Sequence, residues 1–228
     1  MIGQLFVIGC RKEDPYYNTA TVIPVDTSLR AKTYLALGDS YTIGQSVSAE
    51  QRFPYFAVRQ LIDKNINMTP VQIIATTGWT TGNLLSALAA SPPAKTYDFV
   101  TLLIGVNNQY QGRSIDEYRV QFTELLNKAV GYAGLKRSRV FVLSIPDYAV
   151  TPFARGSDTA KISREIDAFN AINKEIALRE GIAYIDITPI SRQARTDPTL
   201  TATDGLHPSG KQYEKWALLL SPAMIAAL

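Results

Sequence analysis

The chain of 228 residues is poor in two chemically versatile side chains, because it contains one cysteine, Cys10, and one histidine, His207. A single cysteine excludes an intrachain disulfide. One histidine, one cysteine and no clustered carboxylates make a poor set of metal ligands, and we expect neither a metal nor another cofactor. Any imidazole chemistry therefore depends on His207.

Long hydrophobic runs and strong net charge are also missing. No apolar stretch approaches the roughly 20 residues that cross a bilayer, and the formal net charge is only +3. The densest basic cluster, GLKRSR at 134–139, is short and is not interleaved with aromatic residues, which argues against a nucleic-acid partner. The composition is 46% hydrophobic and 19% charged, which is typical of a soluble globular protein.

The cysteine ends the stretch LFVIGC at 5–10, which resembles the lipobox of bacterial lipoproteins. However, residues 1–9 carry no positive charge and are barely long enough for a signal peptide. Two interpretations stay open. If Cys10 is lipidated, the true start lies upstream and we expect an envelope, periplasmic or secreted protein with a membrane anchor. If Cys10 is an incidental thiol, we expect a cytoplasmic protein. Residues 1–32 are therefore treated as an N-terminal extension, and residues 33–228 as the domain.

From Thr33 onward, strand-like and helix-like patterns alternate. Strands are predicted at 33–38, 71–76, 97–105, 139–146 and 182–187, and helices at 53–66, 80–91, 114–133, 158–181 and from His207 to the C-terminus, with a break at Pro222. Ser114 with Glu117 predicts a capping box, and Asp158 an N-cap. Several strands are continuous apolar runs, which indicates burial on both faces. The pattern predicts an α/β domain with three layers, α/β/α, around a five-stranded parallel sheet.

Polar residues follow each predicted strand, where α/β domains place their active sites. Ser40 follows the first strand, and a serine nucleophile needs a base, for which His207 is the available imidazole. Asp204, three residues earlier, can hold the Nδ1 proton and leave Nε2 for Ser40. Backbone N–H groups of Ser40 and Gly78 and the side chain of Asn107 are candidates for an oxyanion hole. Asn108 is a rival for Asn107, and Asp39 is expected to brace the serine loop.

The blocks GDSYT, Gly78, GVNN and DGLHP, in this order, resemble the SGNH hydrolase superfamily, or GDSL lipases and esterases, from about Thr33 to the C-terminus. The four marker residues of the family would be Ser40, Gly78, Asn107 and His207, with Asp204 orienting the histidine. The fourth letter of GDSL is Tyr41 here. The resemblance implies a flavodoxin-like sheet with strand order 2-1-3-4-5. The Gly-x-Ser-x-Gly elbow of α/β-hydrolases does not fit, because Thr42 stands two residues after the serine.

The predicted activity is hydrolysis of carboxylic esters through an acyl-enzyme intermediate on Ser40. Two alternatives are a carbohydrate O-acyltransferase or deacetylase with the same triad, and a non-catalytic binding module of the same fold. The substrate would be a small-molecule, lipid or glycan ester, and neither the acyl length nor the oligomeric state is indicated. Residues expected on the pocket wall are Trp79, Asn108, Tyr110, Asp147, Tyr148, Phe153 and the stretch 52–55.

Overall fold

A computed structural model of the chain describes residues 30–228. Cys10 and the remainder of residues 1–29 lie outside this range, so the lipobox interpretation is not addressed by the structure. Among the helices of residues 30–228, none combines the length and apolar character that crossing a bilayer requires.

Within this range, a parallel sheet of five strands forms the centre of the fold. The strands are β1 (Tyr34–Gly38), β2 (Gln72–Ala75), β3 (Phe99–Leu103), β4 (Val140–Leu143) and β5 (Ala183–Ile185). Their order is β2-β1-β3-β4-β5, and every neighbouring pair is parallel. The predicted fold class and the strand order implied by the family resemblance are both confirmed.

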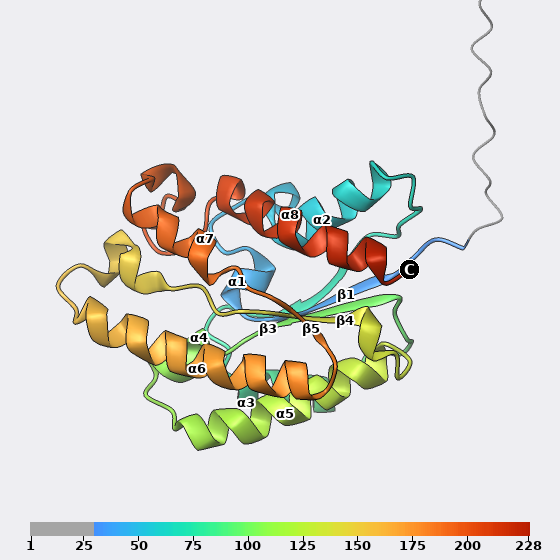
Figure 1. Cartoon of the computed structure of the whole chain (residues 1–228), viewed down its shortest axis with the longest axis horizontal. Coiled ribbons are helices and arrows are strands. Elements are labelled where there is room, and N and C mark those ends of the chain that lie inside the picture. Colours follow the sequence, from blue (N-terminus) through green and yellow to red (C-terminus); the bar gives the residue numbers. More distant parts are fainter. Residues whose placement is uncertain (1–29) are drawn as a thin grey trace, which may run out of the picture.

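Helices cover both faces of this sheet. They are α1 (Ser40–Ile43), α2 (Phe53–Ile62), α3 (Thr81–Ala90), α4 (Val106–Tyr110), α5 (Ile115–Tyr132), α6 (Thr159–Arg179), α7 (Thr188–Arg192) and α8 (Gly210–Ala226). Figure 1 shows α2, α7 and α8 on one face and α3, α5 and α6 on the other. A helix lies in the connection between each pair of consecutive strands and brings the chain back, so that the next strand runs parallel to the one before. The carboxyl ends of all five strands therefore lie at one edge of the sheet.

Burial explains why the strands could be recognised. Every residue of the central strands β1, β3 and β4 is buried, whereas the edge strands β2 and β5 are partly exposed. The continuous apolar runs of the sequence therefore coincide with strands that helices cover on both sides. On the α2–α8 side, the Trp216 and Tyr213 rings pack against Phe53. The sheet thus provides a rigid base for the loops at its carboxyl edge.

The predicted helix starts agree with the structure in most places. Asp158 caps α6 by accepting the N–H of Lys161, and Ser114 caps α5 by accepting the N–H of Glu117. The Glu117 carboxylate, however, accepts a hydrogen bond from Gln121. Only half of the predicted capping box therefore forms at this position.

The prediction for the last helix is wrong at both points. The helix α8 begins at Gly210, with Ser209 as its N-cap, and continues through Pro222. Proline removes the hydrogen bond to the carbonyl four residues earlier. That residue, Leu218, is exposed on the helix surface, where water can satisfy the carbonyl. The helix therefore tolerates Pro222 without ending.

Candidate active site

Residues from separate strand ends line one cavity at the carboxyl edge of the sheet. Ser40 follows β1, Gly78 follows β2, Asn107 follows β3, Tyr148 follows β4, and His207 precedes α8. The cavity has a volume of about 160 Å³ and is lined by Ser40, Tyr41, Thr77, Gly78, Val106, Asn107, Tyr110, Tyr148, Phe153, Leu206 and His207. The structure thus brings Ser40, Gly78, Asn107 and His207 together, as the sequence pattern predicts.

The loop before Ser40 is shaped by close packing. A Cβ atom at Gly38 would collide with the Thr42 hydroxyl and with the carbonyl oxygen of Leu103, so only glycine fits where the strand turns into α1. Asp39 is the N-cap of α1, and its Oδ1 accepts the N–H of Tyr41 at 3.0 Å. Ser40 is therefore the first helical residue, held at the start of a short helix that faces the cavity.

The His207 ring is held by the carboxylate of Asp204. Asp204 Oδ2 lies 2.6 Å from His207 Nδ1, and Oδ1 accepts the backbone N–H groups of Leu206 and His207, each at 2.9 Å. Partial burial raises the pKa of Asp204, but the Ser46 hydroxyl, these N–H groups and His207 outweigh it and lower that pKa to about 2. Asp204 is thus ionised at neutral pH, which favours the tautomer with its proton on Nδ1.

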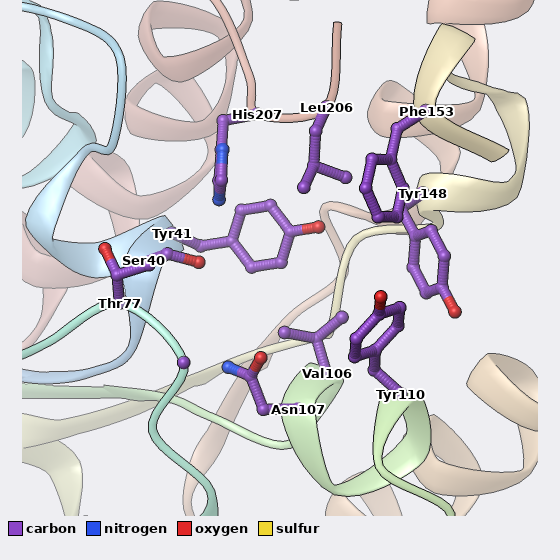
Figure 2. Close-up of a pocket in the computed structure, with 11 residues that line it drawn as sticks. Ser40, Tyr41, Thr77, Val106, Asn107, Tyr110, Tyr148, Phe153, Leu206 and His207 are labelled. Atoms are coloured by element: carbon purple, nitrogen blue, oxygen red, sulfur yellow. The ribbon is translucent and has the colours of Figure 1, made fainter. Parts of the chain in front are cut away.

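Tyr41 supports the histidine from a second side. The Tyr41 and His207 rings meet edge to face, with centroids 5.6 Å apart, and Tyr41 also packs on Trp216. Figure 2 shows the His207 ring directed toward the end of the cavity where Ser40 lies. Between these two described side chains there is no direct hydrogen bond, and such contacts are often long before a substrate binds. Both side chains line the cavity.

The loop that contains Gly78 is fastened by two side-chain amides from the α4 region. Asn107 Nδ2 donates to the carbonyl oxygen of Trp79 at 3.0 Å, and Gln111 Nε2 donates to that of Gly78 at 3.4 Å. The backbone φ of Gly78 is +83°, a conformation that favours glycine. Since an amide nitrogen carries two hydrogens, Asn107 retains a second donor after binding Trp79.

Three aromatic rings form the far wall of the cavity. The centroids of Tyr110, Tyr148 and Phe153 are 6.1–6.3 Å apart. Figure 2 shows these rings at one end and Ser40, Asn107 and His207 at the other. The N–H of Phe153 donates to the carbonyl oxygen of Gly205 at 2.9 Å, which ties the aromatic wall to the loop that carries His207. The cavity thus has a polar end and an apolar end.

A family model decides the classification. The model of the GDSL-like Lipase/Acylhydrolase family matches residues 36–215. The chain belongs to this family. As a GDSL-family member it is an enzyme that acts on ester bonds. No curated protein matches the sequence.

Solved structures show the same GDSL-family fold at low identity. A lipase/acylhydrolase from Enterococcus faecalis has a TM-score of 0.63 and 19% identity, covering 85% of this chain and 96% of its own. The lipase Lip_vut3 from a goat rumen metagenome has a TM-score of 0.66 and 21% identity, covering 85% and 97%. A variant of the acetyl xylan esterase Axe2 from Geobacillus stearothermophilus has a TM-score of 0.60 and 18% identity, covering 86% and 94%.

Several residues expected on the pocket wall of this GDSL-family enzyme lie elsewhere. Asn108 is fully buried, and its amide binds both the N–H and the hydroxyl of Thr81 at the start of α3. Trp79 lines a separate hollow beside β2, and its carbonyl oxygen accepts the Asn107 amide. Within the stretch 52–55, Phe53 and Pro54 are buried at the start of α2. Of the two neighbouring asparagines, the structure therefore directs Asn107 to the cavity and Asn108 to the core.

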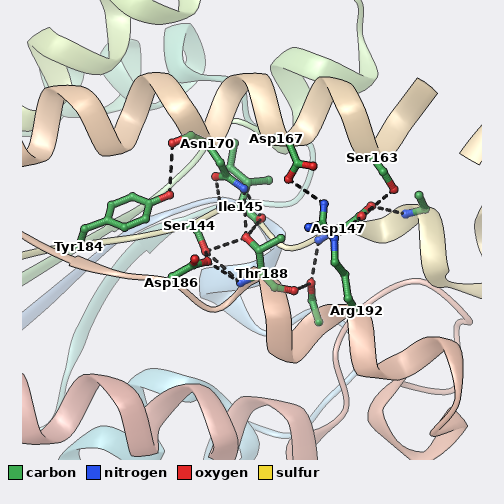
Figure 3. A network of polar contacts seen from close by, with 12 residues as sticks. Ser144, Ile145, Asp147, Ser163, Asp167, Asn170, Tyr184, Asp186, Thr188 and Arg192 are labelled. Carbon is green, nitrogen blue, oxygen red and sulfur yellow. Dashed lines mark hydrogen bonds and ion pairs between the residues drawn. The ribbon is translucent and has the colours of Figure 1, made fainter. Parts of the chain in front are cut away.

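Asp147 is also turned away from the cavity, although it was expected on the wall. Its side chain is 1% exposed, and a buried carboxylate must be paired. Figure 3 shows this pairing: Oδ2 accepts from Arg192 Nε at 2.9 Å and from the Ser163 hydroxyl at 2.7 Å, while Oδ1 accepts the N–H of Ala149. Asp147 thus anchors the loop with Tyr148 to α6 and α7.

Some residues around the site were not predicted at all. Thr77, Val106 and Leu206 line the cavity, and Ser46 bonds to Asp204 from a distant loop. Thr77 and Val106 directly precede Gly78 and Asn107, so their neighbours in sequence could have indicated them. Ser46 carries no such signal, because a serine within GQSVS is typical of any turn.

The carboxyl group of Asp39, which directly precedes Ser40, is buried. It is fully buried, and the backbone N–H groups near it, such as that of Tyr41, only partly offset the loss of water. Loss of solvation by burial raises the pKa of Asp39 to about 7. The ionised form of this side chain is therefore costly in the folded state.

This burial predicts a pH-dependent stability. An exposed aspartate has a pKa of about 3.9, so between about pH 4 and pH 7 the folded chain keeps a proton that the unfolded chain has lost. Stability contributed by Asp39 is then lost as the pH rises through this window. Asp39→Asn keeps the acceptor for Tyr41 and cannot ionise. We expect its free energy of unfolding, relative to the wild type, to increase by about 1–3 kcal/mol from pH 4.5 to pH 8 in urea titrations. Parallel curves for Asp39→Asn and the wild type would contradict the expectation.

Proposed function

We propose that this GDSL-family enzyme hydrolyses carboxylic esters with short acyl groups through Ser40, His207 and Asp204. The observation that carries the proposal is the 2.6 Å contact between Asp204 and His207 Nδ1, at a cavity that Ser40 also lines. With the proton of Nδ1 held by Asp204, Nε2 is the ring atom that can accept a proton from Ser40.

The proposed reaction has two halves. Ser40 Oγ attacks the ester carbonyl while His207 Nε2 takes its proton, and the negative oxygen is stabilised by N–H groups of Ser40, Gly78 and the Asn107 amide. His207 then protonates the departing alcohol, leaving an acyl group on Ser40. Water, deprotonated by His207, attacks the acyl-enzyme; as the bond between the acyl group and Ser40 Oγ breaks, His207 returns the proton to Oγ and the acid is released.

The size and lining of the cavity support a short acyl group. Its volume of about 160 Å³ is close to that of an apolar cavity that holds a benzene molecule, so it suits an acyl chain of up to about six carbons. The apolar end is formed by Tyr110, Tyr148 and Phe153. We therefore place the acyl chain against these rings, with its carbonyl next to Ser40.

A series of p-nitrophenyl esters from acetate to palmitate, with acetylated sugars alongside, tests this proposal. We expect kcat/KM to peak between two and six acyl carbons and to fall at least about 10-fold by twelve, because longer chains leave apolar surface in water. Phe153→Ala should shift the preference toward longer chains, whereas the exposed Leu178→Ala on α6 should not. A maximum at palmitate would contradict the short-acyl proposal. Formation of a new ester when an alcohol acceptor is added would indicate acyl transfer.

Asn107→Ala is expected to lower kcat by about 10²–10³-fold, the usual cost of losing one oxyanion donor. The control is Gln111→Ala, which loosens the same loop by removing the bond to the Gly78 carbonyl but leaves Asn107 in place. We expect less than a 10-fold effect from this control. Equal losses in steady-state assays of the two variants would assign Asn107 to loop support only.

A further inference from the structure

Ser46 contacts the Asp204 carboxylate from outside the loop that carries His207. Its hydroxyl donates to Asp204 Oδ2 at 2.6 Å, across 158 residues of sequence. The same oxygen lies 2.6 Å from His207 Nδ1. Together with the two backbone N–H groups on Oδ1, the Ser46 hydroxyl completes the set of donors around this carboxylate.

The backbone at Ser46 is held in an unfavourable conformation. Its φ is +66°, in the left-handed region that non-glycine residues seldom adopt. Such strain persists only where the surroundings enforce it, and it concentrates at functional sites. Here the strained residue is the one whose hydroxyl reaches Asp204.

The segment that carries Ser46 is continuous with the helix of Ser40. Gly44 ends α1, and the N–H groups of Gly44 and Gln45 both donate to the carbonyl oxygen of Ser40 at 3.0 Å. The side chain of Gln45 accepts from the Thr77 hydroxyl at 2.7 Å, which joins the segment to the loop of Gly78. Ser46 therefore links the element that positions Ser40 to the loop that positions His207.

We propose that Ser46 is a positioning residue of the reaction centre, whose hydroxyl fixes the Asp204 carboxylate and thereby aligns His207 with Ser40. This inference rests on the proposed function, since it assigns a role within the same Ser40–His207–Asp204 set. The Asp204 side chain is 30% exposed, so without the Ser46 hydroxyl water can bind Oδ2 and the carboxylate can rotate. Such a rotation would misdirect the imidazole.

The decisive variant is Ser46→Gly, because glycine removes the hydroxyl and accepts the positive φ without strain. We expect kcat for p-nitrophenyl butyrate to fall about 10-fold, as for the loss of one hydrogen bond to a charged group, with KM changed less than 2-fold and the Tm unchanged. The control is Ser48→Ala, an exposed serine of the same loop, which should keep full activity. Ser46→Ala should lose activity similarly and also lower the Tm, because it loses the hydrogen bond but keeps the Cβ atom and hence the strain that serine already has at positive φ.

A double-mutant cycle separates positioning from general support of the loop. In an Asp204→Asn background, Ser46→Gly should cause no further loss, because the group that Ser46 positions is already gone. Independent, multiplicative losses would overturn the inference, as would full kcat in Ser46→Gly. If Ser46→Gly keeps full kcat while Ser40→Ala is inactive, only the role of Ser46 falls. If Ser40→Ala is itself active, the proposed function and this inference both fall.

Discussion

Ser40→Ala is expected to lower kcat by about 10⁴–10⁶-fold, the largest effect of any single substitution in this enzyme. Without the hydroxyl no acyl-enzyme can form, and only the oxyanion donors and substrate binding remain to assist attack by water. Alanine fits the start of α1 because the cap of that helix comes from Asp39, which is unchanged. Stopped-flow assays should show a burst of p-nitrophenol in the wild type and none in the variant.

Labelling by a fluorophosphonate tests the same role by a second route. Peptide mapping should place the label on Ser40, and Ser40→Ala should not be labelled. The exposed Ser157→Ala is a matched control that should keep both the burst and the label. Activity of Ser40→Ala within 10-fold of the wild type, or a label on another residue, would contradict the assignment of the nucleophile.

The part of the fold that could be predicted is the part with a repeating pattern. The central strands are continuous apolar runs, and α5 and α6 are long enough to show a helical period. The helices α1, α4 and α7 have four or five residues, and a single turn has no period to recognise. These short helices nevertheless carry Ser40 and Asn107 to the cavity. The sequence therefore predicts the sheet well and the elements at its edge poorly.

The candidate site likewise has a part that could be predicted from the sequence and a part that could not. The contact of Asp204 with His207, at the cavity that Ser40 also lines, could be predicted because the chain has one histidine and a carboxylate lies three residues before it. The residues of the cavity wall could not be predicted. Adjacent residues on a helix point about 100° apart, and the sequence alone does not say whether Asn107 or Asn108 faces the cavity. Asp147 was misplaced for a different reason.

Long-range pairing decides where Asp147 and Ser46 point. The partner of Asp147 is Arg192, 45 residues later, and the partner of Ser46 is Asp204, 158 residues later. Neither pair follows a local pattern, since each depends on how loops from different strands meet at the sheet edge. A polar residue after a strand can therefore be predicted to lie near the site, but not to line it.

Asp204→Asn is expected to lower kcat by about 10⁴-fold while the fold is kept. The Asn side chain can keep an oxygen acceptor for the backbone N–H groups of Leu206 and His207. It would then place an NH₂ group against His207 Nδ1, which must accept rather than donate. The proton of the neutral imidazole then sits on Nε2, so Nε2 can no longer accept the proton of Ser40. NMR of the histidine ring nitrogens should show this change of tautomer.

Asp197→Asn is a matched control for Asp204→Asn. Asp197 Oδ1 also accepts a backbone N–H two residues on, and its Oδ2 pairs with Lys211, outside the cavity. Hydrogen bonds from Thr199 and Lys211 lower the pKa of Asp197 to about 2, so both carboxylates stabilise the fold above about pH 4 and lose that contribution as the pH falls toward 2. Both variants should therefore show a weaker acid dependence of the Tm, but only Asp204→Asn should lose activity. A kcat within 10-fold of the wild type for Asp204→Asn would mean that another group orients His207.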